Sequence, residues 1–245
     1  NIKIPQAQKD LLNELIKTGK PIVLTLFNGR PIDLTDENAT VPAILNTWFA
    51  GSEAGYAIAD VLFGNENPSG KITMTFPRSV GQVPIYYAAK NTGRPLGNKE
   101  GKIKKFRSNY IDERNEPLLT FGFGLSYTTF TYGKIAISAN KMSSTEKLKV
   151  TVPVTNSGNF DGKEIVQLYI RDVVGSVTRP IKELKGFQKI EFKKGETKTI
   201  TFEISIEDLK FYNSDLQFVA ESGKFEVFVG TNSDTTEKVE FELVN

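Results

Sequence analysis

Hydrophobic residues in the first half of the chain are spaced in two different ways. In residues 6–18, apolar side chains recur every three or four positions, which is the spacing of an amphipathic helix. Residues 21–27 instead form a continuous apolar run rich in β-branched residues, and residues 41–49 repeat that character. Such runs are typical of strands buried on both faces of a parallel sheet. The pattern therefore predicts one helix followed by two buried strands.

A second helix and a third strand are expected next. Apolar residues return to helical spacing at 54–64, and Ser52 stands where an N-cap belongs. Residues 71–77 alternate, which predicts a shorter strand near a sheet edge. The order helix, strand, strand, helix, strand is typical of the later part of a doubly wound α/β unit. Three parallel strands cannot cover both faces and both edges of their own sheet, so we expect the missing cover to come from a longer parent protein or from a partner.

From residue 134 onward the apolar pattern changes to a period of two. Clear examples are residues 148–154, 200–204 and 225–229, where an apolar side chain stands at every second position. Turn residues separate about seven short strands of this kind. The pattern predicts an antiparallel β-sandwich, with a single helical turn at 206–209 between two of its strands.

The two patterns meet at a Phe-Gly-Phe-Gly run at residues 121–124. Its glycines disfavour both a helix and an interior strand, while they allow two backbones to come close. The neighbouring aromatic side chains can bury large apolar areas. We interpret residues 118–132 as a packed seam between a first domain at 1–117 and a second domain at 133–245. An ordinary glycine-containing turn is the alternative.

Residues 79–117 form a long irregular stretch at the end of the first domain. Loops of this length in compact domains are often functional, although the general behaviour of loops favours a solvated surface excursion. The stretch is locally basic and carries tyrosines, at Lys99, Lys102, Lys104, Lys105 and Arg107 and at Tyr86, Tyr87 and Tyr110.

Composition narrows the chemistry that this chain can perform. Its 245 residues carry 31 basic and 29 acidic side chains, so charge gives no case for binding nucleic acid or an anionic membrane. No apolar run approaches the roughly 20 residues of a membrane-spanning helix. The chain has no cysteine and no histidine, which excludes disulfides, metal sites built on these residues and histidine-assisted nucleophiles. Any catalysis has to rest on carboxylates, lysine or tyrosine, and neither a metal site nor a cofactor is expected.

Several motifs, in their order along the chain, resemble one known family. They are Thr-Trp-Phe-Ala-Gly-Ser-Glu-Ala-Gly at 47–55, Asn-Pro-Ser-Gly-Lys at 67–71, Phe-Gly-Phe-Gly-Leu-Ser-Tyr-Thr at 121–128, Asn-Ser-Gly at 156–158 and Glu-Ser-Gly at 221–223. Together they resemble the family-3 glycoside hydrolases, in particular the periplasmic β-glucosidase branch of that family. The resemblance extends over nearly the whole chain.

The resemblance implies an enzyme of three domains: a barrel, an α/β sandwich and a fibronectin type III-like domain. This chain would hold the later part of the α/β sandwich at 1–117 and the fibronectin type III-like, immunoglobulin-like sandwich at 133–245. The family hydrolyses terminal β-D-glucosyl residues with retention, through two carboxylates. The resemblance implies that the aspartate nucleophile lies in the barrel and the glutamate acid/base lies on a loop just before residue 1. No catalytic residue is therefore expected in this chain, which alone is expected to be inactive.

The same resemblance implies partners and a location. The partners are the barrel and the first part of the α/β sandwich of the same enzyme, together with a β-linked oligosaccharide substrate. Neither nucleic acid nor a membrane is expected as a partner, and the implied location is the periplasm or the cell exterior.

Two residues of the long loop are candidates for substrate binding at the rim of the active site. They are Tyr110 and Asp112, although an exposed acidic group is more often simply solvated. Trp48 could stack on a sugar, but its position at the end of an apolar strand favours packing. The alternative function is a non-catalytic carbohydrate-binding or cell-surface β-sandwich module, and a third interpretation is a spacer or dimerisation surface.

Overall fold

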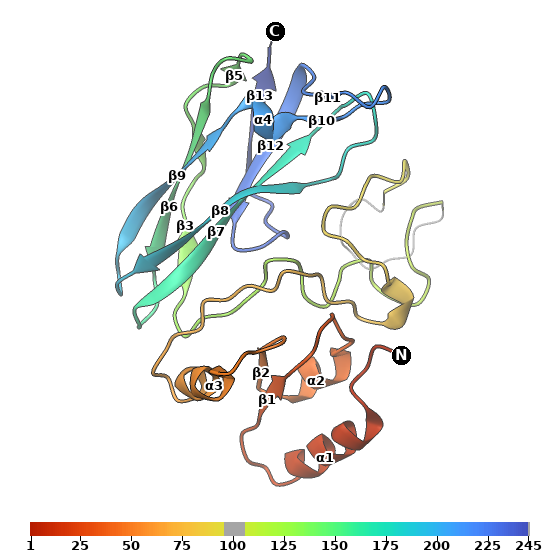
Figure 1. Cartoon of the computed structure of the whole chain (residues 1–245), viewed down its shortest axis with the longest axis vertical. Coiled ribbons are helices and arrows are strands. Elements are labelled where there is room, and N and C mark those ends of the chain that lie inside the picture. The colour runs from red at the N-terminus through yellow and green to blue at the C-terminus, as the bar shows by residue number, and fades with distance from the viewer. Residues whose placement is uncertain (96–105, 245) are drawn as a thin grey trace. The chain divides into compact units, whose positions relative to one another are not determined.

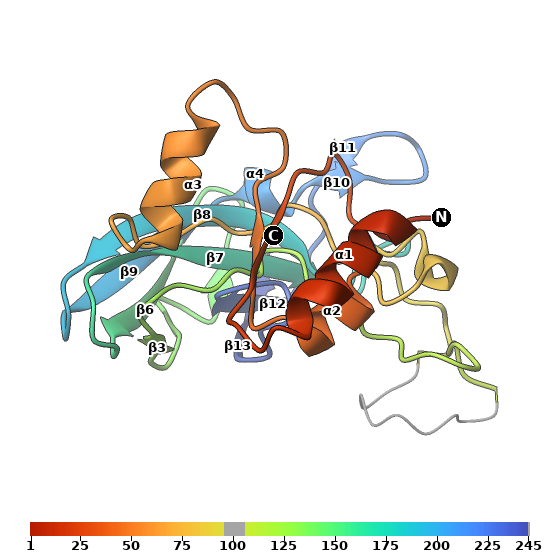
Figure 2. The same cartoon turned by 90° about the horizontal axis from the view of Figure 1, so that it is seen from below.

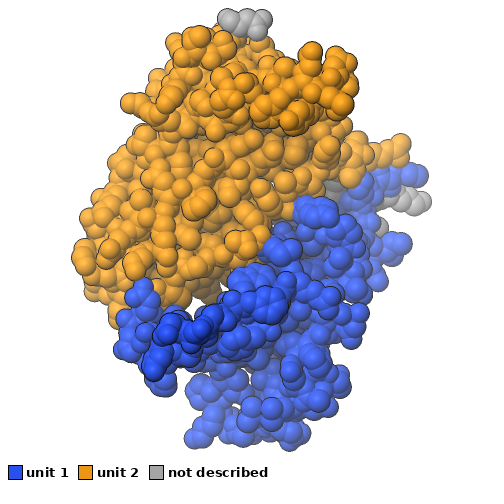
Figure 3. Space-filling view, in the orientation of Figure 1, with its two compact units in different colours: residues 1–66, 74–86, 96–120 blue, residues 67–73, 87–95, 121–245 orange. Residues whose placement is uncertain are grey.

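The computed structural model describes residues 1–95 and 106–244, which divide into two compact units (Figures 1 and 3). The basic residues Lys99, Lys102, Lys104 and Lys105 of the long loop lie outside the described residues. The chain passes between the units several times, so each unit is assembled from separate stretches of sequence. Of the described residues, unit 1 contains 1–66, 74–86 and 106–120, and unit 2 contains 67–73, 87–95 and 121–244.

Unit 1 contains the predicted helices and a parallel strand pair. Its elements are α1 (Gln6–Ile16), β1 (Val23–Leu26), α2 (Thr35–Thr40), β2 (Ala43–Asn46), α3 (Ala54–Leu62) and a 3₁₀ turn, η1 (Val80–Gln82). Strands β1 and β2 pair in parallel, as their continuous apolar runs predicted. Figures 1 and 2 both show α1 beside α2, where the ammonium of Lys9 lies 2.8 Å from a carboxylate oxygen of Asp36.

The third strand predicted at 71–77 is absent from the described structure. Phe76 instead forms one isolated antiparallel bridge, in which its N–H donates to the carbonyl of Leu119 at 2.9 Å. Pro77 follows directly and has no N–H with which to continue a ladder. The parallel sheet of unit 1 therefore has two strands among the described residues.

Two further predictions about unit 1 are wrong in detail. Helix α3 begins at Ala54, so Glu53 rather than Ser52 is the N-cap, and no side chain caps the helix. The reason is a turn in which the N–H of Ala54 donates to the carbonyl of Gly51 at 3.1 Å. Strand β1 is not buried on both faces, because Val23 at its start is 48% exposed.

Unit 2 is the predicted β-sandwich. Its longer strands are β6 (Leu148–Asn156), β7 (Gly162–Asp172), β8 (Glu183–Phe192), β9 (Thr197–Ile204), β12 (Gly223–Gly230) and β13 (Lys238–Leu243). The short elements are β3 (Phe130–Tyr132), β4 (Ala136–Ile137), β5 (Lys141–Met142), α4 (Ile206–Leu209), β10 (Phe211–Tyr212) and β11 (Phe218–Val219). One large sheet has the order β5-β13-β12-β7-β8, a second joins β3, β4 and β9 around β6, and β10 pairs separately with β11. All pairings are antiparallel except that of β5 with β13.

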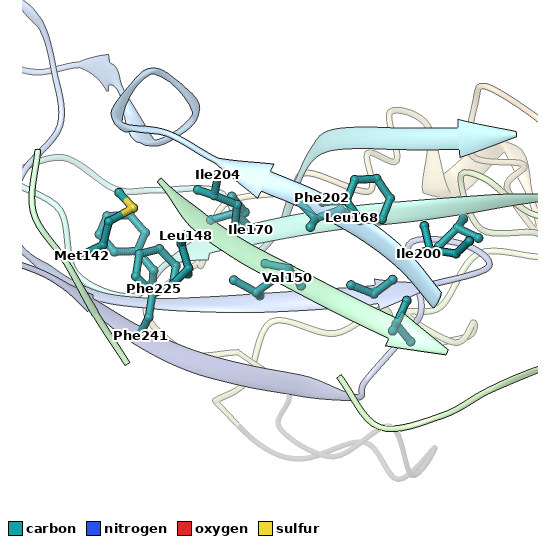
Figure 4. Packing of buried hydrophobic residues seen from close by; sticks show 14 of the residues in the cluster. Met142, Leu148, Val150, Leu168, Ile170, Ile200, Phe202, Ile204, Phe225 and Phe241 are labelled. Atoms are coloured by element: carbon teal, nitrogen blue, oxygen red, sulfur yellow. The ribbon is translucent and has the colours of Figure 1, made fainter. Parts of the chain in front are cut away.

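Alternate side chains of both sheets point inward and form one hydrophobic core (Figure 4). Along β6 the buried positions are every second residue, as the period of two requires. Fully burying one such side chain contributes about 1.5–3 kcal/mol. Core residues labelled in Figure 4 include Met142, Leu148, Val150, Leu168, Ile170, Ile200, Phe202, Ile204, Phe225 and Phe241.

The Phe-Gly-Phe-Gly run belongs to unit 2, and it packs there at positions that require glycine. Gly122 has φ +80°, a conformation that residues with a side chain rarely adopt, and Gly124 lies so close to the carbonyl of Gly70 that a Cβ would overlap it. The ring of Phe121 stacks on that of Tyr87, with centroids 4.2 Å apart. The predicted close approach of two backbones is therefore confirmed.

Asp161 stabilises the turn between β8 and β9. Its carboxylate accepts the N–H of Lys194 at 2.8 Å and lies 3.0 Å from the ammonium of Lys193. The backbone hydrogen bond first, and the lysine side chain second, lower the pKa of Asp161 from its usual 3.8. Because the folded pKa lies below the unfolded one, this carboxylate stabilises the fold above about pH 4, and the contribution is lost as the pH falls through the folded pKa.

We expect Asp161→Asn to lower the melting temperature at pH 7 and to converge with the wild type as the pH falls toward 3. Thermal unfolding followed by circular dichroism across this pH range measures the difference. The control is Asp215→Asn, at an exposed aspartate of another turn, which is expected to track the wild type at every pH. A deficit of Asp161→Asn that does not change with pH would contradict the assignment.

Candidate functional site

The carboxyl ends of β1 and β2 form one edge of unit 1. In open α/β sheets this edge is where ligands bind. Leu26 and Asn46 are paired at the ends of the two strands. Thr47 fixes the edge, because its N–H and its hydroxyl both donate to the carbonyl of Leu26, at 2.9 and 2.7 Å.

Trp48 adopts an unusual backbone conformation at this edge. Its φ is +53°, which is rare for a bulky residue and is typically maintained only by surrounding structure. The indole is half-buried, and its ring lies 5.8 Å from the ring of Phe76. The next residue, Phe49, is 86% exposed. Packing against Phe76 agrees with the structural interpretation of Trp48, while Phe49 is the aromatic ring that solvent reaches.

Two amide side chains at the same edge have buried atoms without partners. Both polar atoms of the Asn46 amide, and the amide oxygen of Asn28, are buried with no hydrogen bond among the described residues. The Asn28 nitrogen is satisfied, since it donates to the carbonyl of Arg30 at 2.8 Å. Leaving a buried polar atom unpaired costs about 1–3 kcal/mol. These amides therefore indicate a hydrogen-bonding partner that is not among the described residues.

The described part of the long loop is held by one buried glutamine. The amide oxygen of Gln82 accepts the N–H of Arg78 at 2.6 Å, and its nitrogen donates to the carbonyls of Arg114 and Glu116 at 2.7 and 3.2 Å. Gln82 is fully buried, so each of these bonds is shielded from water. A single side chain thus joins η1 to the segment that carries the candidate residues.

The structure places Tyr110 and Asp112 on one turn but in different surroundings. Tyr110 is half-buried, its hydroxyl lies 3.5 Å from the carbonyl of Gln82, and its N–H donates to the side chain of Asn115 at 3.1 Å. Asp112 is exposed. The neighbouring Glu113 accepts the N–H of Arg114 at 2.7 Å, which is a local structural role. Contact of Tyr110 or Asp112 with a substrate stays a prediction.

Sequence reasoning missed Gln82 at the candidate turn and, separately, Asn28 and Asn46 at the strand edge. Gln82 gives no local signal, because the two carbonyls that bind its amide nitrogen lie more than 30 positions away in the chain. Asn28 follows strand β1 and Asn46 ends strand β2. A polar residue at the carboxyl end of a strand is the one cue that could have identified them. Helix α2 was also not predicted, because its six residues are too few to display a helical period.

The chemistry available at this site is hydrogen bonding and aromatic packing. Within residues 1–95 and 106–244, no group of three carboxylate, imidazole or thiol side chains could hold a metal ion. None of the helices described in these ranges is long and apolar enough to cross a membrane. Amides, a phenol and an exposed carboxylate are groups that recognise hydroxyl-rich ligands.

Both parts of the chain match models of known protein families. Residues 1–127 match the model of the "Glycosyl hydrolase family 3 C-terminal domain", and residues 164–233 match that of a "Fibronectin type III-like domain". These matches confirm the predicted fold class, an α/β domain followed by a fibronectin type III-like sandwich.

Relatives cover this chain almost completely and extend well beyond it. The chain is 53% identical over 244 residues to the periplasmic beta-glucosidase of Salmonella typhimurium. The aligned region covers 100% of this chain and 32% of that protein. It is 44% identical over 228 residues to a beta-xylosidase of Formosa agariphila, covering 92% and 30%. A solved structure of the beta-glucosidase from Listeria innocua with isofagomine has a TM-score of 0.93 at 43% identity, covering 99% of this chain and 34% of that one. The chain thus spans about a third of the length of these relatives.

We expect Gln82→Leu to release the turn that carries Tyr110 and Asp112. The change removes one acceptor and two donors from a buried network, so it is expected to cost about 3 kcal/mol of stability. Hydrogen–deuterium exchange should quicken across residues 108–116. The control is Gln8→Leu, on the exposed face of α1, which should leave that exchange unchanged. Wild-type protection of 108–116 in Gln82→Leu would show that other contacts hold the turn.

Proposed function

This chain belongs to glycosyl hydrolase family 3, through the C-terminal domain of that family, and we propose that it is the C-terminal portion of a β-glucosidase. The whole enzyme would hydrolyse terminal β-D-glucosyl residues with retention of configuration. In this proposal the chain supplies scaffold and part of the active-site rim. The aspartate nucleophile and the glutamate acid/base belong to the rest of the enzyme.

One observation carries the proposal: unit 1 has apolar faces with no cover among the described residues. Leu11 on α1 is 61% exposed, Phe27 just after β1 is 62% exposed, and α3 buries no residue. Large apolar side chains exposed on several elements of one unit are the kind of surface that contact with other protein covers. The buried amide atoms of Asn28 and Asn46 that have no partner among the described residues lie at the edge of the same strand pair. We infer that the barrel and the first part of the α/β sandwich of the same enzyme cover these faces.

The rim role of Tyr110 and Asp112 is the finer part of the proposal. Asp112 is exposed and offers two acceptor oxygens to sugar hydroxyls, whereas Glu113 beside it already accepts a backbone N–H. Tyr110, anchored at Gln82, would set the position of the turn. The periplasm is proposed as the location, on the strength of the Salmonella relative's name.

We expect the isolated chain to show no turnover of an aryl β-glucoside, because it lacks the reactive carboxylate pair. Adding the segment that precedes it in the gene, as a separately expressed polypeptide, should restore hydrolysis. The same addition should reduce binding of an apolar dye to the chain, since it covers Leu11 and Phe27. Robust turnover by the isolated chain would contradict the proposal. Binding of oligosaccharide without restored turnover would favour the non-catalytic module instead.

We expect Asp112→Asn in the whole enzyme to raise KM about tenfold or more with little change in kcat. A hydrogen bond between a carboxylate and a substrate hydroxyl is worth about 1.5–3 kcal/mol, and its loss weakens ground state and transition state alike. Steady-state kinetics with an aryl β-glucoside measure both constants. Glu113→Gln, one residue away, is the control and should leave KM unchanged. An unaltered KM in Asp112→Asn would remove this residue from the rim.

A further inference from the structure

Lys71 lies in unit 2, although α3 before it and Phe76 after it lie in unit 1. Its ammonium lies 3.2 Å from a carboxylate oxygen of Glu164 on β7 and donates to the carbonyl of Gly124 at 2.9 Å. The two side chains are 11% and 3% exposed. This ion pair is therefore almost completely removed from water.

Tyr132 on β3 binds the other oxygen of the same carboxylate. Its hydroxyl donates to Glu164 at 2.9 Å. Burial first, and the charge of Glu164 second, raise the pKa of Tyr132 far above its usual value, so the phenol keeps its proton and remains a donor. Both oxygens of Glu164 thus have a partner, as a buried carboxylate requires.

A second anchor stands four residues before Lys71. The amide oxygen of Asn67 accepts the hydroxyl of Ser126 and the N–H of Tyr127, both at 2.8 Å, and its nitrogen donates to the carbonyl of Asp161 at 2.9 Å. Just after Lys71, Ile72 exchanges two backbone hydrogen bonds of 2.8 Å with the Phe-Gly-Phe-Gly run. Residues 67–73 are therefore held to unit 2 at both ends.

This arrangement links the two units through the chain itself. Within unit 2, Ile72 is bonded to Phe123. Within unit 1, Phe76, four residues after Ile72, is bonded to Leu119, four residues before Phe123. Once Ile72 is bonded to Phe123, forming the bond between Phe76 and Leu119 closes only the few residues between the two pairs. Without the first pair, the same bond has to close a loop of the whole stretch 77–118. Loop closure costs more entropy as the loop lengthens. Closure of the pair in unit 2 therefore favours the bridge in unit 1.

We propose that Lys71, Glu164 and Tyr132 form a buried latch that couples the unfolding of the two units. The latch keeps residues 67–73 in unit 2 and so keeps positions 72 and 123 together. Removing one member of a buried ion pair strands the other charge in the interior, which is strongly destabilising. An exposed ion pair has no such effect.

The chain contains its own reporter for each unit. Trp48 is the single tryptophan and lies in unit 1, so its fluorescence follows that unit during urea unfolding. Far-ultraviolet circular dichroism follows chiefly the strands of unit 2. In the wild-type chain the two signals are expected to have coincident midpoints, the mark of a single cooperative transition.

In Lys71→Met the circular dichroism midpoint is expected to fall by about 1–2 M urea, and the two midpoints are expected to separate. The double variant Lys71→Met with Glu164→Gln should lose less than the sum of the two single changes, because it leaves no stranded charge. The matched control is Lys141→Met, which removes an exposed pair with Glu242 at 3.4 Å and should change neither midpoint.

Three results would overturn the latch. They are separate midpoints already in the wild type, coincident and unshifted midpoints in Lys71→Met, and strict additivity in the double variant. If Lys71→Met does not fold, Tyr132→Phe provides the milder test, since it keeps the ring and removes only the donor to Glu164. A smaller shift in the same direction supports the latch, and unshifted, coincident midpoints in this folded variant overturn it.

Discussion

Burial of alternating apolar side chains between two sheets is the interaction on which the rest of this structure depends. Unit 2 satisfies it within its own residues, because most of its buried apolar side chains form one cluster drawn from elements between residues 142 and 243. A complete core can also accommodate polar groups, provided that each is paired. Gln167 shows this, because its buried amide donates to the carbonyls of Gly122 and Thr231 and accepts the hydroxyl of Tyr169. Gln167 and Glu164 are buried polar residues of unit 2 that bind segments distant in the sequence, at Gly122 and at Lys71.

Unit 1, in contrast to unit 2, leaves much of its apolar surface exposed. Its sequence carries the apolar patterns of an α/β domain, yet the described residues leave one side of α1, β1 and α3 open to solvent. The amide oxygen of Asn28 and both amide atoms of Asn46 are buried near the end of the same strand pair, with no partner among the described residues. Exposed apolar surface of this kind marks a site of contact with other protein. Packing therefore supports the proposal that further protein covers unit 1, independently of the family match.

How far the sequence predicts the structure depends on the range of the interactions involved. The sandwich was predictable because a period of two over strands such as 148–154 admits one burial pattern. The strand expected at 71–77 was wrong because alternation does not distinguish a ladder from an isolated bridge at Phe76. Tyr110 and Asp112 could be selected from their loop, but Gln82, which holds that loop, acts on residues far along the chain. No local pattern encodes such a contact.

The interleaving of the two units limits how this protein could have been assembled during evolution. Unit 2 draws on residues 67–73 and 87–95 as well as on 121–244, so no single break in the gene separates it from unit 1. A β-sandwich transferred from residue 133 onward would leave Lys71 and Tyr87 behind, and Glu164 would arrive in its new host without its counter-ion. Exon-style exchange of this module is therefore disfavoured, and the α/β and β-sandwich portions are expected to be inherited together.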